Sequence, residues 1–402
     1  MLQFFSASTG IVNSRRAVRE CLEIALEGEP NLDCDLIIFH TSMGHNFKEL
    51  LSEVRKVAPG AQIAGCTGAG VIGNEGPNQT MKALGIMAIK GPKSEFAVTS
   101  IESWENRDQF EAAAELSGNL LQLNPDTRVV MVFPPSSGML AADKIIEGVD
   151  SVFGPEVPLI GGIAMDNMKA INCFQFFNDR IIENGGLMIG FSDPTLKLFC
   201  QASHGMKVMK EISFEATKAE SNLIFELNGQ PAWKIIANTL DIPESTPWQE
   251  YAMLAFLANE VPAPLQNAFG EHYYLNVLIG DAKTGVLSCN RTVRQGSYFY
   301  LAKRDEELMF QGVDHIAQRI AGHLEGKKPA AVFHADCIIR GRMSFDRVLK
   351  DEIVARMQYP ICRGQKIPWL GFYSGGEFAR IGGKNIFNIF TTTLNVLYRN
   401  DE

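Results

Sequence analysis

The apolar residues in the first 160 positions follow two alternating patterns. Short continuous apolar runs at residues 2–7, 34–40 and 61–66 predict buried β-strands. Between these runs, apolar residues recur at helical spacing, as in the segment that follows Asn13, a residue type favoured at a helix N-cap. The alternation predicts an α/β fold of the mixed α+β kind, with at least one mixed sheet.

The rest of the chain, from about residue 157, is richer in strand signals. Two earlier runs, at 83–89 and 95–101, follow one another without a helix and predict a hairpin around residues 90–92. No exact internal repeat is evident. Since 402 residues exceed one ordinary core, and 241–250 carries two prolines, we expect two domains. They are residues 1–240 and 241–402, each a mixed sheet with packing helices.

Composition narrows the class of protein. The chain is 46% hydrophobic and 21% charged, with a formal charge of −9 that argues against a nucleic-acid binder. Its longest apolar windows are of strand length, well below the roughly 20 residues that a membrane helix needs. Eight scattered cysteines without a C-x-x-C pair are typical of reduced thiols. We therefore expect a cytoplasmic protein without a membrane or nucleic-acid partner.

Loops at strand ends provide the first candidate site. Gly65, Cys66 and Thr67 close one predicted strand, and Asp166 follows a glycine-rich run. Ligands of α/β sheets bind beyond the carboxyl ends of strands, so these residues are expected to line a pocket. The glycines could instead serve only the turn geometry. A Cys66-based enzyme with His45 and Asp166 is a further alternative.

A second candidate site lies near the end of the chain. Two apolar runs, at 329–337 and 369–378, deliver Cys337, Arg340, Tyr373 and Glu377 into glycine-rich ends. If the two strands are neighbours, a guanidinium and a carboxylate meet there. A ligand with carboxylate and amine groups would suit that pair, although Arg340 and Glu377 could equally bridge each other.

The histidines provide candidates for a haem ligand. No histidine pair is spaced convincingly for a metal site, but a single histidine can be the axial ligand of non-covalent haem. His204 and His45 lie beside glycines at predicted strand ends, and His272 is a third candidate. Each of them could also be an ordinary hydrogen-bonded histidine of the core.

Several motifs resemble the FIST family, whose members combine a FIST N-terminal domain with a FIST C domain. The resemblance runs in order along nearly the whole chain. Its motifs are the turn GCT at 65–67, PLIGGIAMD at 158–166, SHG at 203–205, ELNGQPA at 226–232, CIIRG at 337–341, GFYSGGE at 371–377 and FNIFTTTLN at 387–395.

The resemblance implies a sensory protein that binds small molecules such as amino acids and has no catalytic activity. It also implies a separate signalling partner, such as a histidine kinase or a cyclic-di-GMP enzyme, while self-association is left open. MGHNF at 43–47 and the segment 70–91 are similar to the NosP-type group of the family, which binds haem and senses nitric oxide. Haem b is therefore an expected cofactor if this chain belongs to that group, and an amino-acid ligand is expected otherwise.

Overall fold

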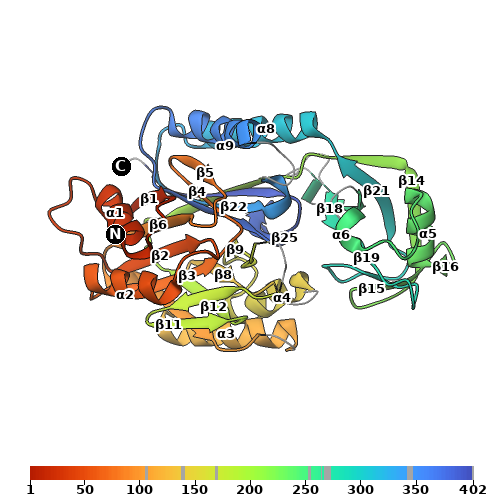
Figure 1. Ribbon diagram of the computed structural model, residues 1–402, viewed down its shortest axis with the longest axis horizontal. Coiled ribbons are helices and arrows are strands. Elements are labelled where there is room, and N and C mark those ends of the chain that lie inside the picture. Colours follow the sequence, from red (N-terminus) through yellow and green to blue (C-terminus); the bar gives the residue numbers. More distant parts are fainter. Residues whose placement is uncertain are drawn as a thin grey trace.

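The chain forms a body of three β-sheets and a lobe built on a fourth, as the computed structural model in Figure 1 shows. The structure describes residues 1–104, 107–136, 141–167, 171–251, 255–263, 265–266, 273–341 and 347–400. Each body sheet mixes parallel and antiparallel pairs and carries helices on one face. These features confirm the predicted mixed α+β class.

One succession of elements occurs three times in the body: strand, helix, strand, helix, strand, two-stranded hairpin, strand. The first unit consists of β1 (Gln3–Thr9), α1 (Ser14–Ala25), β2 (Leu36–Thr41), α2 (Phe47–Val57), β3 (Gln62–Thr67), β4 (Val71–Gly73), β5 (Gly76–Asn78) and β6 (Leu84–Lys90). The second consists of β7 (Phe96–Ile101), α3 (Gln109–Leu123), β8 (Val129–Phe133), α4 (Ala142–Phe153), β9 (Leu159–Gly162), β10 (Phe174–Phe177), β11 (Arg180–Glu183) and β12 (Gly186–Phe191). The third consists of β13 (Lys197–Ser203), α8 (Glu306–His323), β22 (Lys327–Cys337), α9 (Arg347–Cys362), β23 (Trp369–Ser374), β24 (Glu377–Ile381), β25 (Lys384–Asn388) and β26 (Thr392–Asn400).

The three units share one strand order and are linked in a ring. Their orders are β1-β6-β2-β3, β7-β12-β8-β9 and β13-β26-β22-β23. The hairpin of each unit extends the sheet of another, since β10 pairs with β3, β24 with β9 and β4 with β23. The repeat is thus one of topology. It also makes the predicted β6–β7 hairpin wrong, because β6 joins β1 and β2 while β7 joins β12.

Glycine occupies the same place in the third strand of every unit, as Gly65, Gly161 and Gly371. An added Cβ would lie 2.0, 2.3 and 2.6 Å, respectively, from a carbonyl oxygen of the neighbouring parallel strand. These distances are far below van der Waals contact, so the close approach of the two backbones requires glycine. The three carbonyls belong to Phe39, Val132 and His334.

The helices pack in pairs on the outside of the body. α1 and α2 lie against the first sheet, α3 and α4 against the second, and α8 and α9 against the third (Figure 1). Asn13 caps α1 as predicted, its side chain accepting from the amide of Arg16 at 2.9 Å. Inner faces of all three sheets form a shared core that includes Ile38, Met131 and Phe333.

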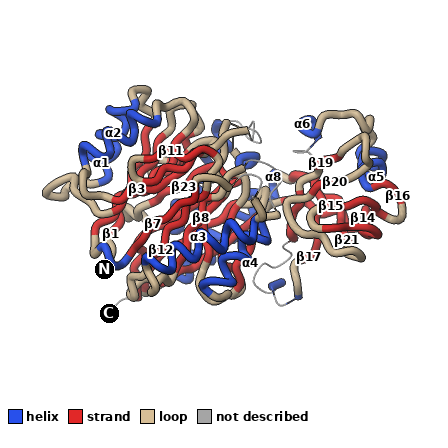
Figure 2. Tube along the Cα trace, turned by 90° about the horizontal axis from the view of Figure 1, so that it is seen from below, coloured by secondary structure: helices blue, strands red, loops and turns tan. Residues whose placement is uncertain are grey.

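The lobe is inserted in the third unit, between β13 and α8, and stands to one side of the body (Figures 1 and 2). Its own core surrounds Trp233, which is fully buried. The division at residues 240 and 241 stays a prediction. The elements are β14 (Met206–Glu220), β15 (Leu223–Leu227), β16 (Gln230–Pro231), α5 (Ala232–Leu240), α6 (Trp248–Tyr251), β17 (Ala255–Glu260), β18 (Tyr273–Asn276), β19 (Ile279–Gly280), β20 (Leu287–Ser288) and β21 (Tyr298–Arg304).

Candidate functional site

The candidate site lies where β22 and β23 end. The two predicted strands are parallel neighbours, which meets the condition set in the sequence analysis, with Asp336 opposite Tyr373 and Cys337 opposite Ser374. β22 passes into a short 3₁₀ turn that ends at Arg340, and β23 passes through two glycines to Glu377. The arrangement brings one guanidinium, two carboxyls and two hydroxyls together, which we call the Arg340 cluster (Asp336, Arg340, Tyr373, Ser374 and Glu377).

A buried ion pair forms the centre of the Arg340 cluster. Arg340 Nε donates to Asp336 Oδ1 at 2.9 Å, and both side chains are only 1% exposed. Arg340 Nη1 donates to the backbone oxygen of His204 at 2.8 Å. Among the described residues, no ion pair joins Arg340 to Glu377. The alternative that Arg340 and Glu377 bridge each other directly is therefore wrong, because Asp336 is the carboxylate paired with Arg340.

The two carboxyls of the cluster have raised pKa values. Burial raises the pKa of Asp336 to about 6, against the opposing effect of the Arg340 charge. Glu377 accepts a hydrogen bond from Ser374 Oγ at 2.9 Å. Burial nevertheless raises the pKa of Glu377 well above its usual value, which favours its neutral form. At neutral pH the charge of the cluster is thus carried mainly by Arg340 and Asp336.

Four of the five side chains in the Arg340 cluster, all except Ser374, each have one buried polar atom without a hydrogen-bond partner in the part of the chain described. Leaving such an atom unpaired costs about 1–3 kcal/mol, so together they offset much of a typical folding free energy of about 5–15 kcal/mol. Water can serve these atoms in the free protein, and a ligand can replace it. The atoms are Asp336 Oδ2, Arg340 Nη2, Tyr373 OH and Glu377 Oε2.

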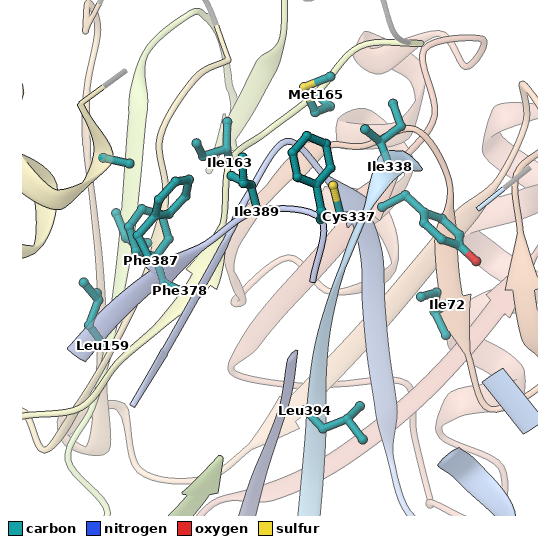
Figure 3. Packing of buried hydrophobic residues seen from close by; sticks show 14 of the residues in the cluster. Ile72, Leu159, Ile163, Met165, Cys337, Ile338, Phe378, Phe387, Ile389 and Leu394 are labelled. Carbon is teal, nitrogen blue, oxygen red and sulfur yellow. The ribbon is translucent and has the colours of Figure 1, made fainter. Parts of the chain in front are cut away.

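Apolar side chains surround the same strand ends. Figure 3 shows Ile163, Met165, Ile338 and Ile389 around Cys337. They belong to one buried cluster that also includes Tyr373. Burial raises the pKa of the Cys337 thiol well above its usual value, so this cysteine is an inert part of the wall. The site therefore combines a polar centre with an apolar surround.

The other predicted strand-end residues make local contacts, in the first sheet or, for Asp166, in the loop that follows β9. The Cys66 thiol lies 3.3 Å from His40 Nδ1, and burial raises its pKa well above the usual range. Thr67 Oγ1 accepts from the amide of Phe174 at 3.0 Å. Gly65 presses on the neighbouring strand, as described above. Asp166 accepts from the amide of Ile171 at 3.0 Å, so these positions have local structural contacts.

The predicted Cys66–His45–Asp166 grouping has a different arrangement in the structure. His45 Nδ1 contacts Ser14 Oγ at 3.1 Å, and His45 Nε2 contacts the Lys82 carbonyl at 2.9 Å. It is His40, stacked on Phe372, that lies beside the cysteine. The sequence suggested His45 because it follows the strand, whereas His40 lies within it.

The contacts of the ring nitrogens decide whether a candidate histidine can bind haem iron. An axial histidine must present one nitrogen to the iron. Both nitrogens of His45 are engaged, and those of His204 face the amides of Met206 at 2.8 Å and Tyr273 at 3.4 Å. Because both ring nitrogens of His45 and of His204 are in contact with other groups, these two histidines do not fit the role of an axial haem ligand. His272 lies outside the described residues.

Sequence reasoning missed two members of the Arg340 cluster, Asp336 and Ser374. A signal for Asp336 was present, because it stands four residues before Arg340, a spacing typical of ion pairs within a turn of helix. Ser374 carried no comparable signal. Within the described ranges, no group of three or more His, Cys, Asp or Glu side chains is arranged to hold a metal ion. None of the described helices is both long and apolar enough to span a membrane.

Comparisons with known proteins give distant relatives. An uncharacterized protein of Mycobacterium tuberculosis is 22% identical over 391 residues, covering 94% of this chain and 95% of that protein. An uncharacterized protein of Methanocaldococcus jannaschii is 21% identical over 385 residues, covering 90% of this chain and 70% of its own.

Two solved structures resemble the chain over almost its whole length, at low TM-scores. A cyanuric acid hydrolase from A. caulinodans has a TM-score of 0.36 and 8% identity, with 100% of both chains covered. A chorismatase has a TM-score of 0.37 and 9% identity, with 99% of both covered. At these values neither likeness bears on the activity of this chain.

Family models match most of the sequence. The FIST N domain matches residues 35–230, and the FIST C domain matches residues 232–380. The two matches follow one another in the order that the motifs indicated. The chain belongs to the FIST family of sensory domains.

Proposed function

We propose that the protein is a non-enzymatic sensor whose Arg340 cluster binds a small zwitterion, an α-amino acid with an apolar side chain. The observation that carries the proposal is the set of four buried, unpartnered polar atoms. Arg340 Nη2 and Tyr373 OH are donors that suit a carboxylate, whereas the Asp336 Oδ2 atom is an acceptor that suits an ammonium group. The ammonium charge would also favour the ionised form of Glu377, whose Oε2 atom would then be a second acceptor. The ligand would complete hydrogen bonds that the fold leaves open.

The surroundings of the cluster support an apolar side chain on the ligand. Ile163, Met165, Ile338 and Ile389 offer no further hydrogen bonds, so an additional polar or charged group would be buried there at a cost (Figure 3). Small-ligand sites are commonly apolar with a few placed polar groups. The amino acids that fit best are therefore aliphatic.

Signalling through a separate partner is part of the proposal. A histidine kinase or a cyclic-di-GMP enzyme would respond to occupancy of the site. Catalysis by Cys66 is not favoured, because its thiol is fully buried and its pKa is raised, whereas a nucleophilic cysteine needs a lowered pKa. A haem-based nitric-oxide sensor is the other ligand class, and it depends on His272 among the three candidate histidines.

Thermal unfolding, haemin uptake and turnover measurements distinguish an amino-acid sensor, a haem sensor and an enzyme. Aliphatic amino acids should raise the unfolding midpoint of the purified protein, and charged amino acids should raise it less. A protein that stays unchanged with every amino acid but takes up haemin with a Soret band, lost in His272→Ala, would overturn the proposal in favour of haem sensing. Turnover that is lost in Cys66→Ser would overturn the non-enzymatic part.

A further inference from the structure

The junction between lobe and body holds a second group of unsatisfied side chains, apart from the Arg340 cluster. The chain leaves β20 and returns toward the body at Asn290, whose carbonyl accepts from the amide of Ala142 at 3.2 Å. Two residues on, the amide of Thr292 donates to both carboxylate oxygens of Asp143 at 3.1 Å. These bonds fix the segment 290–292 of the lobe against helix α4 of the body.

Arg291 lies between the two parts, where the Asp143 charge acts on it without a direct ion pair among the described residues. Its guanidinium stacks on the Tyr274 ring at 3.9 Å and donates through Nη2 to the carbonyl of Phe387, in β25. Among the described residues, the buried Nε atom has no hydrogen-bond partner and the guanidinium forms no ion pair. Asp143 acts on Arg291 electrostatically, but its carboxylate oxygens accept from the amide of Thr292. One nitrogen of the guanidinium, Nη2, is thus held by the Phe387 carbonyl, and the Nε–H donor is left open.

Two buried amides add further donors to the junction. Asn290 Oδ1 accepts from the amide of Val277 at 3.0 Å, and Nδ2 of the same side chain has no partner in the described part of the chain. The same holds for Asn388 Nδ2, one residue beyond the Phe387 carbonyl. The two asparagines are only 9% and 4% exposed. Among the described residues, the junction thus has three unsatisfied N–H groups, and the buried hydroxyl oxygen of Thr292, which can donate or accept, is unsatisfied as well.

We propose that Arg291, Asn290 and Asn388 form an oxyanion-binding site that takes a carboxylate or phosphate group. The guanidinium and the two amide donors match the acceptors of an oxyanion, whereas the guanidinium would repel a cation. Hydrogen bonds to a charged group are stronger than those between neutral groups, so they offset the desolvation of a bound anion. The oxyanion site does not depend on the ligand proposed for the Arg340 cluster.

The oxyanion site lies between the lobe and the body. Asn290 and Arg291 come from the lobe, whereas Asn388 belongs to β25 of the body. An anion bound between them joins the two parts. Asn388 is also the cross-strand partner of Glu377, so the anion lies next to the strand that supports the Arg340 cluster. Occupancy of the oxyanion site would thereby hold the lobe against the body.

The test measures the unfolding midpoint of the full chain with increasing sodium phosphate or sodium acetate, at constant ionic strength against sodium chloride. We expect a saturable rise with at least one of the two anions. A rise with phosphate alone identifies a phosphoryl ligand, and a rise with acetate alone identifies a carboxylate. An identical response to all three salts, or no response, overturns the site.

Variants make the test specific. Asn388→Asp keeps the side chain's size but replaces an amide donor with a carboxylate, so the apparent affinity should fall about tenfold or more. Arg291→Gln should have the same effect, whereas Arg294→Gln, the same charge change at an exposed position, should leave the response unchanged. Equal responses in wild type, Asn388→Asp and Arg291→Gln would overturn the proposal. If Arg291→Gln fails to fold, Asn388→Asp decides the matter.

Hydrogen exchange provides a second readout. Saturating anion should slow amide exchange at residues 290–292 and 387–388, because it ties these segments together. A midpoint shift without slower exchange there would place the anion elsewhere and contradict the assignment.

Discussion

The buried ion pair of Arg340 and Asp336 allows ligand binding to be separated from stability. In Arg340→Met, the Asp336 carboxylate loses its partner while 1% exposed, and the His204 carbonyl loses a 2.8 Å hydrogen bond. Removing one member of a buried pair costs about 3–5 kcal/mol. At about pH 8, where Asp336 is ionised, we expect a loss of this size in the free energy of unfolding.

The loss should depend on pH in a defined direction. The pKa of Asp336 is about 6 in the folded protein, and the Arg340 charge holds it below what burial alone would give. Without Arg340 the pKa rises further, so at about pH 5 the carboxyl of Arg340→Met is neutral and no longer needs a counter-charge. The destabilisation should shrink to about 1–2 kcal/mol, the cost of the lost neutral hydrogen bonds.

The double variant Arg340→Met/Asp336→Leu is the matched control. Replacing a buried pair with apolar residues of similar volume is often neutral or stabilising by about 1–4 kcal/mol. Denaturant unfolding followed by circular dichroism should thus find the double variant near or above wild type, yet unable to respond to an amino acid. A double variant as unstable as Arg340→Met would refute the reasoning, because the ion pair would then be required for the stability of the fold.

Three further predictions concern other parts of the protein. Gly161→Ala should lower the free energy of unfolding by about 3 kcal/mol, because its Cβ would lie 2.3 Å from a backbone oxygen. Gly118→Ala, in open space on α3, should raise it by about 0.5–1 kcal/mol. Urea unfolding midpoints check both. Iodoacetamide should leave Cys66 unmodified in the native protein at neutral pH, as peptide mass spectrometry would detect. Because folding raises the pKa of Asp336 from 3.8 to about 6, this carboxyl adds about 3 kcal/mol of stability that is fully present below pH 3.8 and lost as pH rises through 6. Asp336→Asn should flatten this part of the stability profile.

Local features of the fold were predictable from the sequence. The helix that Asn13 caps and the strands within 329–337 and 369–378 were recognisable, because capping and apolar runs act over a few residues. Their pairing was not established by the sequence. The three-unit ring was not. Its repeated glycines, Gly65, Gly161 and Gly371, are separated by unequal distances, and about a hundred residues of lobe interrupt the third unit. Pairing between distant strands leaves little trace in a single sequence.

The candidate site was predicted in part. Arg340, Tyr373 and Glu377 were named because they follow buried strands and carry polar groups. Their partners were not, since the choice of Asp336 over Glu377 depends on how the 3₁₀ turn directs the guanidinium. Cys66 looked equally promising in sequence, but its neighbour in space is His40, which only the strand register reveals.

The central claim is that the Arg340 cluster recognises both a carboxylate and an ammonium group. Isothermal titration of the wild-type protein with aliphatic amino acids, their N-acetyl derivatives and their methyl esters tests it directly. The account predicts that at least one free amino acid binds, that neither blocked form of it binds measurably, and that Arg340→Met/Asp336→Leu binds none. Equal binding of a blocked form, or undiminished binding by the double variant, would contradict it.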